Sequence, residues 1–598
     1  MQIQATLATG DLRIDALLGA TRWAGTGSQA IELTFSFPNA SSQWPTAAGE
    51  YGAGDAWGPL NDFTSLSESD KSAVRAALQT WSSVANVQFV ETADNASGQG
   101  ILRFAWTASS VNEQSAAYEP ATSDKAGDVW LNALAPWDGF LPGSYGFSTL
   151  IHEIGHALGL KHPDEGAMVL PAAQDSYAFS LMSETAYAVE TGSWVDFEPT
   201  TPMLYDFLAI QALYGINPTS SNGDDTYVFT ENQPYFQTLW DSGGNDTIIW
   251  RSQAQGARID LNAGQFSQLG ESLTYWSEDF SRSWTDRDTV AIAFGVAIEN
   301  AVGGNGSDWL IGNAFDNHLT TGLGNDSIIG GAGTDTVILP MFPNVFTLTE
   351  SSPGHVTGSY AGYSLSLNDV ELVQFGRPPS AGDPERFQTT IALSELVSGE
   401  AQLQLGRLTD LYLAFFGRAP DVGGLEYWQE RLLEEGRDFA TISKDFAWST
   451  EAQALFPPAA SNREFVRTVY LNCFGRQPDS GGWDYWTGRL DGLGVTDLSD
   501  RGAFVGELIL GAYAPSSGEE DRSLLTNRHE AAMYYVNKLS TTPAEGYDTA
   551  INALLARVTA VAATEDKAED VIDYAFANPV TLTGVMADQA LLDSIWGT

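Results

Sequence analysis

A nine-residue repeat between residues 303 and 338 constrains the fold of this 598-residue chain more than any other feature. Its four units read GGNGSDWLI, GNAFDNHLT, TGLGNDSII and GGAGTDTVI. Each unit joins a turn of about six residues, which uses glycines for positive φ, to a short strand with one inward-facing apolar residue. The pattern is typical of a parallel β-roll that binds calcium between its turns. The alternative is a flexible Gly-rich linker, but the register kept over four units argues against it.

A nine-residue unit makes half a coil, so turns two units apart should stack on the same edge of the roll. Asp308 should therefore pair with Asp326, and Asn317 with Asp335. The first pair offers two carboxylates to a hard dication and the second offers one, so we expect weaker binding there. The residues expected to point inward are Leu310, Leu319, Ile328 and Val337. The earlier segments 222–226 and 241–246 share the same Gly-Asp chemistry.

A second motif, HEIGHALGLKHP over residues 152–163, indicates a catalytic metal. His152 and His156 are four residues apart, so on a helix they lie on one face. Gly159 can take the positive φ that ends the helix, after which His162 supplies a third nitrogen. Three nitrogen ligands with one open position are typical of catalytic zinc, and Glu153 could act on a zinc-bound water. A helix that carries histidines by chance is the alternative.

The motifs indicate that the chain folds into several domains. Residues 1–215 are predicted to form an α/β domain, with strands at 31–37, 87–90, 101–106 and 128–131 and helices at 67–84, 145–160 and 204–214. Residues 216–375 form the predicted calcium-binding β-roll, and 376–400 a linker.

Residues 401–598 are predicted to form an all-α domain with an internal repeat. The segment 412–428 recurs at 470–486, and each copy reads as a helix, a Gly-Arg-x-Pro-Asp turn and a second helix with Tyr-Trp. We expect these aromatic side chains to lie in the core, with sugar binding as a secondary alternative.

Composition excludes several classes of partner. A net charge of -48 with only 28 Lys and Arg argues against nucleic acid and against an anionic membrane surface. Cys473 is the only cysteine, so no intrachain disulfide framework can form. The first 23 residues lack a signal-peptide pattern, and no run of about 18 apolar residues predicts a transmembrane helix. Because calcium sites would be empty in cytosol, export without an N-terminal signal stays open.

The zinc motif resembles the metzincin signature H-E-x-x-H-x-x-G-x-x-H, followed by a Met-turn at 180–183. The segments 127–132, 142–146, 205–215, 240–248 and 295–304 further resemble the serralysins, bacterial RTX metalloproteases. This resemblance covers roughly residues 10–375. It implies a metzincin zinc-protease domain on a calcium-binding β-roll, exported by a signal-less type I route and folded by calcium outside the cell.

The resemblance also implies ligands. One calcium would be held by Ser221, Gly223, Asp225, Asp241, Gly243 and Asp246, and the next with help from Gly244, Asp246 and Glu299. The repeat turns supply Gly303, Asn305, Asp308, Asn317, Gly322, Gly324, Asp326, Gly331, Gly333 and Asp335.

One residue departs from the family pattern. Serralysins carry a tyrosine two residues after the Met-turn methionine, where it can ligate zinc, but this chain has Glu184 there and its nearest tyrosine is Tyr187. Glu184 is expected either to ligate zinc as an inhibitory fourth ligand or, the alternative we favour, to point to solvent.

The helical repeats resemble a domain type of unknown function, DUF4214, and more distantly the surface-anchoring regions of S-layer proteins. Ordinary serralysins lack such a domain, so the resemblance implies retention at the cell surface, through a surface-layer protein or lipopolysaccharide.

The sequence therefore predicts a secreted zinc endopeptidase that cleaves protein or peptide substrates, with zinc and calcium as its metals. Glu153 would take the proton of the attacking water and return it to the leaving amine. A substrate strand could pair with an exposed sheet edge, for which 129–131 is the candidate. Two alternatives stay open: a calcium-dependent surface component with an inactive protease domain, and a processing protease restricted to one surface-layer partner.

Overall fold

The structure is a computed structural model with two compact units, residues 1–317 with 331–333 and residues 318–330 with 334–598. It describes residues 2–596 except 25–29, 48–49, 52–61, 109–114, 136, 340–346, 361–362, 377–387, 398–399, 434, 436, 458–459, 493–497, 515–517, 542–549, 560–562, 578–581 and 588.

The first unit begins with a mixed sheet whose strands run in the order β5-β3-β6-β8-β7, with β4 beside β6. The β3–β5, β3–β6 and β6–β8 pairs are parallel, which confirms the four strands predicted in this region. The strands are β3 (Ile31–Ser36), β4 (Phe63–Thr64), β5 (Val87–Glu91), β6 (Leu102–Thr107), β7 (Ala116–Ala117) and β8 (Asp128–Asn132).

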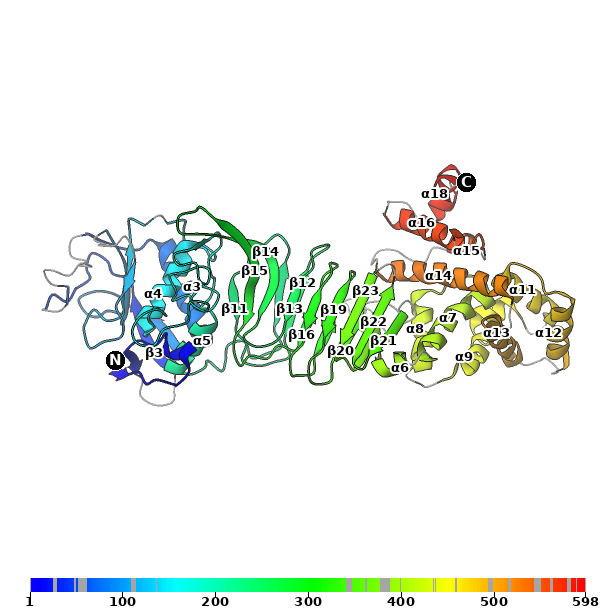
Figure 1. The fold of residues 1–598 in the computed structure, drawn as a ribbon, viewed down its shortest axis with the longest axis horizontal. Coiled ribbons are helices and arrows are strands. Elements are labelled where there is room, and N and C mark those ends of the chain that lie inside the picture. Colours follow the sequence, from blue (N-terminus) through cyan, green and yellow to red (C-terminus); the bar gives the residue numbers. More distant parts are fainter. Residues whose placement is uncertain are drawn as a thin grey trace. The chain divides into compact units, whose positions relative to one another are not determined.

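Three helices pack beside this sheet: α3 (Glu68–Val84), α4 (Tyr145–Leu158) and α5 (Leu204–Tyr214) (Figure 1). The capping box predicted for α3 is present, because Ser67 and Asp70 satisfy each other's backbone N–H groups. Trp81 of α3 donates to the Ile151 carbonyl at 3.0 Å, which ties α3 to α4. Before the sheet lie β1 (Gln2–Ala5), α1 (Leu12–Asp15) and β2 (Thr21–Ala24), and β1 pairs antiparallel with β2.

The candidate edge strand for substrate, residues 129–131, is not an open edge. The short strand β7 pairs with the outer side of β8 through Ala116–Trp130 and Ala117–Val129. All five residues of β8 are also buried. The prediction was wrong because an apolar strand sequence does not tell an edge from a covered position.

Two further sheets follow in this unit. In one, β10 (Thr226–Thr230), β12 (Thr247–Arg251) and β16 (Asn300–Val302) are parallel neighbours. In the other, β13 (Arg258–Asp260) lies parallel to β17 (Trp309–Ile311), and β11 (Gln237–Leu239) lies parallel to β15 (Ser283–Ile292). Strand β14 (Phe266–Trp276) pairs antiparallel with β13 and β15 and also with β9 (Trp194–Val195). This long β14–β15 hairpin was not predicted.

The second unit continues the repeats on alternating sheets. In one sheet β18 (His318–Thr320), β20 (Thr336–Leu339) and β24 (Leu372–Gly376) are parallel. In the other, β19 (Asp326–Ile329) lies parallel to β23 (Tyr363–Asn368), next to the antiparallel strands β22 (His355–Tyr360) and β21 (Thr347–Ser352). The apolar residues predicted to point inward are fully buried: Leu310, Leu319, Ile328 and Val337.

The predicted linker contains regular structure. Strand β25 (Gln388–Ala392) pairs antiparallel with β24, and α6 (Leu393–Val397) follows it. β25 covers an edge of β24 that would otherwise expose its backbone groups, and its two threonines and Ile391 favour a strand. The Pro-rich segments 377–380 and 383–384 lie outside the described residues.

The rest of the second unit is helical, as predicted. Each repeat is a helix pair: α7 (Glu400–Phe416) with α8 (Val422–Leu433), and α11 (Asn462–Phe474) with α12 (Ser480–Gly492). The other helices are α9 (Phe439–Ala447), α10 (Thr450–Leu455), α13 (Leu498–Ala512), α14 (Glu519–Thr541), α15 (Ala550–Leu555), α16 (Ala563–Ala577), α17 (Leu582–Ala587) and α18 (Gln589–Trp596). Of the helices that the structure describes, none combines the length and apolar character needed to cross a bilayer.

The aromatic residues of the repeat divide between core and surface. Tyr412, Tyr470 and Trp428 are buried, but Tyr427 and its counterpart Tyr485 are 47% and 57% exposed. The expectation that the aromatic residues lie in the core was therefore wrong for Tyr427 and Tyr485. Adjacent residues of a helix point in different directions, so one member of each Tyr-Trp pair must leave the core. The repeated Asp421 and Asp479 each accept a hydrogen bond from the N–H of a glycine three residues later, at 2.8 and 2.7 Å, which explains the repeated Pro-Asp-x-Gly-Gly turn.

Candidate metal centre and active site

Helix α4 and the turn after it bring the three predicted histidines together. Ser144 caps the helix by accepting from the Phe147 N–H at 3.2 Å, and His152 and His156 follow on one face. Gly159 ends the helix with a φ of +104°, as predicted. A side chain there would also lie 2.7 Å from the Thr21 carbonyl, so the turn that returns His162 requires glycine.

The Nε2 atoms of the histidines converge. They lie 3.0 Å apart for His152–His156, 3.0 Å for His156–His162 and 3.2 Å for His152–His162. The Nδ1 atoms are engaged elsewhere: His152 with the Leu181 carbonyl at 2.8 Å and His156 with the Leu160 carbonyl at 2.9 Å. Because a carbonyl can only accept, these Nδ1 atoms carry the protons and leave the Nε2 lone pairs facing one point.

This arrangement fits a cation with nitrogen ligands. Burial, with the neighbouring imidazoles, lowers the pKa of His152 well below its usual value and that of His156 to about 4, so both are neutral at pH 7. Three lone pairs so close together repel one another unless a metal ion lies between them. The three-histidine donor set suits zinc with one open position.

Glu153 is the buried carboxyl next to the first histidine. It is 5% exposed, and its Oε2 has no hydrogen-bond partner among the residues that the structure describes. Burial raises the pKa of Glu153 to about 8. A dication nearby would favour the carboxylate form, so the group would become a base when the histidines hold metal.

The Met-turn supports His152 through a network that sequence reasoning missed. The buried Asp206 of α5 accepts from Ser180 Oγ at 2.6 Å and from the Leu181 N–H at 2.7 Å, and the Leu181 carbonyl in turn holds His152. The bulk of Met182 lies against α4: a Cβ on Gly155 would be 2.5 Å from its Sδ. A single acidic residue in the mostly apolar segment 204–214 was the signal that could have identified Asp206.

Glu184 and Tyr187 occupy different surroundings. The Glu184 Oε1 lies 4.0 Å from His162 Nε2, although the side chain is 61% exposed. Tyr187 packs its ring against Tyr275 and Trp284 of the β14–β15 hairpin, at 5.1 and 5.2 Å between ring centres. Of the two candidates for the expected tyrosine position, Glu184 is therefore the one near the histidines.

The first predicted calcium site gathers acidic oxygens. Asp225, Asp241 and Asp246 each place a carboxylate oxygen within 4.8 Å of the others. Gly244 approaches Gly223 so closely that a Cβ would lie 2.1 Å from its carbonyl oxygen. Glu299 accepts from the Asp246 N–H at 2.9 Å, while Asp246 Oδ2 is buried with no hydrogen-bond partner among the described residues. Ser221 and Gly243 have positive φ here, although the Ser221 carbonyl accepts from the Ser242 N–H at 2.7 Å.

The repeat turns bury their acidic and amide side chains: Asp308, Asn317, Asp326 and Asp335. Asp308 accepts from the Ala257 N–H at 2.7 Å, and Asn317 from the Asn313 N–H at 2.7 Å. Asn305 donates its backbone N–H to the Ser252 carbonyl at 2.9 Å. Gly303 leaves room for Asp308, since a Cβ would lie 2.5 Å from its Oδ2. The glycines at positive φ are Gly324, Gly331 and Gly333, while Gly322 is half-buried. The pairs Asp308–Asp326 and Asn317–Asp335 join different units and stay predictions.

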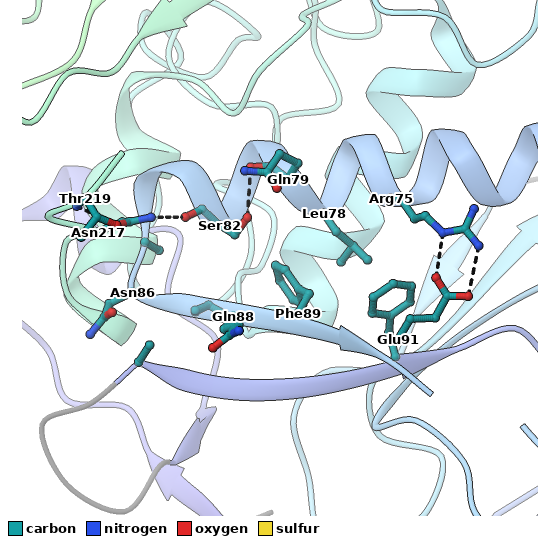
Figure 2. Close-up of a pocket in the computed structure, with 14 residues that line it drawn as sticks. Arg75, Leu78, Gln79, Ser82, Asn86, Gln88, Phe89, Glu91, Asn217 and Thr219 are labelled. Atoms are coloured by element: carbon teal, nitrogen blue, oxygen red, sulfur yellow. Dashed lines mark hydrogen bonds and ion pairs between the residues drawn. The ribbon is translucent and has the colours of Figure 1, made fainter. Parts of the chain in front are cut away.

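A pocket of about 550 Å³ lies elsewhere, between α3 and β5 (Figure 2). Polar uncharged side chains line much of it, among them Gln79, Ser82 and Asn217. Its charged residues Arg75 and Glu91 pair with each other at 2.7 Å. None of the predicted site residues lines this pocket.

Family models match three parts of the chain: Matrixin over residues 60–191, Peptidase M10 serralysin C terminal over 206–357, and the domain of unknown function DUF4214 over 445–497. Serralysin from Photorhabdus laumondii is 34% identical over 290 residues, 44% of this chain and 56% of its own length. Serralysin C from Dickeya chrysanthemi is 35% identical over 320 residues, with coverage of 48% and 60%.

Metallopeptidase AprA from Pseudomonas marginalis is 33% identical over 316 residues, 48% of this chain and 61% of its own length. This chain thus spans less than two thirds of the curated relatives it matches. The predicted resemblance is confirmed: residues 60–191 and 206–357 match the two family models, and the chain is similar there to serralysin-family metzincins.

Proposed function

We propose that this protein is a zinc endopeptidase that hydrolyses peptide bonds in protein substrates. The observation that carries the proposal is the convergence of three Nε2 atoms, 3.0 to 3.2 Å apart, beside the buried Glu153. The histidines His152, His156 and His162 would hold the metal, and backbone carbonyls fix the first two in the required tautomer.

Zinc, when bound, supplies Lewis acidity that polarises a substrate carbonyl and brings the pKa of water toward neutrality. Glu153 accepts the proton of the attacking water and returns it to the leaving amine. The buried Oε2 of Glu153 has no hydrogen-bond partner among the residues that the structure describes. It suits this role, because none of the described hydrogen bonds has to be broken before the oxygen accepts a proton. Asp206 keeps Leu181, and through it His152, in place.

The second part of the proposal is a calcium-folded β-roll over residues 216–375, between a catalytic domain at 1–215 and a helical domain at 401–598. Parallel strands on alternating sheets, inward apolar residues and the Asp225–Asp241–Asp246 cluster support it. Since calcium at such sites is bound outside the cytosol, we propose that the protein acts outside the cell after type I secretion. Retention at the surface or S-layer by the helical domain stays a prediction.

The competing function is a surface component whose protease domain is inactive or held shut by Glu184. The 4.0 Å approach of Glu184 to His162 favours it, and the 61% exposure of that side chain counts against it. A casein-cleavage assay with and without a chelator separates the two.

The test is Glu153→Gln. We expect the variant to keep zinc and the parent circular dichroism spectrum but to lose casein cleavage by about 100-fold to 10,000-fold, the usual contribution of a general base. Glu271→Gln changes an exposed carboxylate of β14 and should cleave casein as the parent does. Undiminished cleavage by Glu153→Gln would rule out the proposed role.

A further inference from the structure

A chain of aromatic rings in the first unit runs from the start of α4 to the tip of the β14–β15 hairpin. Neighbouring rings lie between 5.3 and 6.3 Å apart from centre to centre, within the range of favourable ring pairs. Phe280 and Trp194 are 62% and 44% exposed, and the other four rings are half-buried. These six residues, the aromatic patch, are Trp106, Trp137, Phe140, Tyr145, Trp194 and Phe280.

Aromatic rings in the core of the same domain are arranged differently. Tyr51, Phe104 and Trp130 also contact other aromatic rings, but none of the three is more than 1% exposed. Single exposed apolar side chains are ordinary on a protein surface, whereas a contiguous group of them is typical of a binding surface. The exposure of the aromatic patch therefore points to a ligand.

The tip of the hairpin holds Phe280 in an unusual backbone conformation. Its φ is +56°, a region that residues with a bulky side chain rarely adopt. The turn is ordered: the Phe280 N–H donates to the Ser277 carbonyl at 2.8 Å, and Asp279 accepts from the Ser281 hydroxyl at 2.7 Å. Such conformations persist where the surroundings impose them, and they gather at binding sites. The exposed Phe280 ring is therefore held stacked on Trp194 before any ligand arrives.

Other contacts already attach the hairpin to the domain that carries α4. Strand β14 pairs with β9 through the backbone. Arg282 of the hairpin forms an ion pair with Glu190 at 2.6 Å, and the buried Tyr275 packs on Tyr187. Packing of the hairpin therefore does not account for a strained and exposed ring at Phe280.

Tyr145 joins the aromatic patch to the metal centre. It shares one face of α4 with Thr149, His152 and His156, and these four are the only residues of that helix that are not buried. Seven residues separate Tyr145 from His152, which is about 10 Å along the helix axis. The Trp194 ring lies a further 6.3 Å from the Tyr145 ring. The patch therefore continues the open face of the helix that presents the metal ligands.

We propose that the aromatic patch binds an aromatic side chain of the substrate about three to five residues from the scissile bond, since an extended peptide rises about 3.3 Å per residue. The substrate ring would stack on the exposed rings of Trp194 and Phe280, which lose little conformational entropy on binding. Folded proteins bury most of their aromatic residues, so the patch would favour unfolded polypeptides. The inference rests on the proposed protease function and adds a substrate class to it.

The experiment measures kcat/KM on peptides with one cleavable bond, in which a single Phe replaces Ser in turn at the second to the sixth position on either side. We expect Phe to raise kcat/KM by about 3- to 10-fold at one or two positions in the proposed range, the scale of an aromatic pair. Trp194→Ala and Phe280→Ser should each remove most of this gain and change cleavage of the all-Ser peptide by less than about twofold. Trp309→Ala removes a tryptophan of β17 that is 43% exposed, and this matched control should keep the gain.

The possible outcomes separate the two proposals. Cleavage by the parent protein without a gain from Phe at any position overturns the role of the patch but leaves the protease function intact, whether or not the variants fold. A gain that survives in folded Trp194→Ala and Phe280→Ser also overturns it, as does an equal loss of the gain in Trp309→Ala. Failure of the zinc-loaded protein to cleave any peptide or casein overturns the protease function itself.

Discussion

Two histidine sites in this molecule use the same side chain in opposite ways. In the first unit, His152, His156 and His162 turn neutral Nε2 atoms toward one another, and burial lowers the pKa of the first two. In the helical region, His529 of α14 pairs through Nδ1 with the buried Asp410 of α7 at 3.0 Å. Burial alone would lower the pKa of His529, but the Asp410 carboxylate raises it above its usual value.

The difference lies in what the Nδ1 atom faces. A backbone carbonyl fixes the tautomer without adding a full charge, so the other nitrogen stays available to a metal. A carboxylate stabilises the protonated ring, which then cannot ligate through either nitrogen. The first arrangement leaves nitrogen atoms free to bind a metal, and the second joins α7 to α14 through an ion pair.

The sharpest test of the comparison is to remove one histidine from each site. His156→Ala should lower zinc affinity by more than about 100-fold, since even supporting residues contribute 10–100-fold, and should abolish cleavage. His529→Ala should leave both unchanged. Zinc content after dialysis and casein cleavage are the measurements, and retained zinc in His156→Ala would contradict the site.

Asp206 tests whether the metal site depends on its buried support. Asp206→Ala leaves Ser180 and the N–H groups of Leu181 and Met203 without their acceptor. We therefore expect the free energy of unfolding to fall by about 3 kcal/mol or more. Asp164→Ala, which removes an exposed carboxylate after His162, is the matched control. Denaturant unfolding measures both, and equal stability of the two variants would show that the network matters little.

Calcium should stabilise the strand repeats and not the helices. At a concentration 100 times its dissociation constant, a ligand of the folded state adds about 2.7 kcal/mol to stability. Asp246→Asn removes one of three clustered carboxylates and should lose much of this gain. Thermal unfolding with calcium and with a calcium chelator measures the gain, and an undiminished gain in Asp246→Asn argues against the cluster as a ligand set.

The His529–Asp410 pair predicts a pH dependence with a definite sign. The folded pKa of His529 is raised, so its stabilisation is complete below the unfolded value of about 6.5 and is lost as pH rises through the folded pKa. Loss of a charged hydrogen bond corresponds to about 1.5–3 kcal/mol. The free energy of unfolding, followed by the helical circular dichroism signal, should fall as pH rises in the parent protein. His529→Gln should lack this pH dependence.

Glu184 should have the smallest effect. Its carboxylate lies 4.0 Å from His162 Nε2, but the side chain is 61% exposed. We therefore expect Glu184→Gln to change kcat/KM by less than about fivefold, which corresponds to 1 kcal/mol. A large gain in activity would instead favour the surface component that Glu184 holds shut.

Local patterns predicted the local structure well. The helix of His152 and His156, the capping box at Ser67, the turn at Gly159 and the inward residues Leu310 and Ile328 all follow from spacing within a few residues. Such features depend on contacts between residues that are close in the chain. The spacing of apolar residues and the positions of glycines therefore predict them.

Features built from distant segments were not predictable in this way. The cover that β7 gives β8, the strand β25 within the expected linker and the exposure of Tyr427 depend on which elements become neighbours in space. The outcome for Tyr427 shows the limit clearly, since its partner Trp428 is buried although both belong to one repeated pair.

By itself, the sequence predicted which histidines meet, because two histidines four residues apart on a helix and a third after a glycine turn can converge on one point. The tertiary structure alone decided what surrounds them: Asp206 and Leu181 lie behind His152, and Trp81 of α3 holds the helix that carries it. These residues are far apart along the chain, and their chemistry arises from burial and charge after packing, which no local pattern carries.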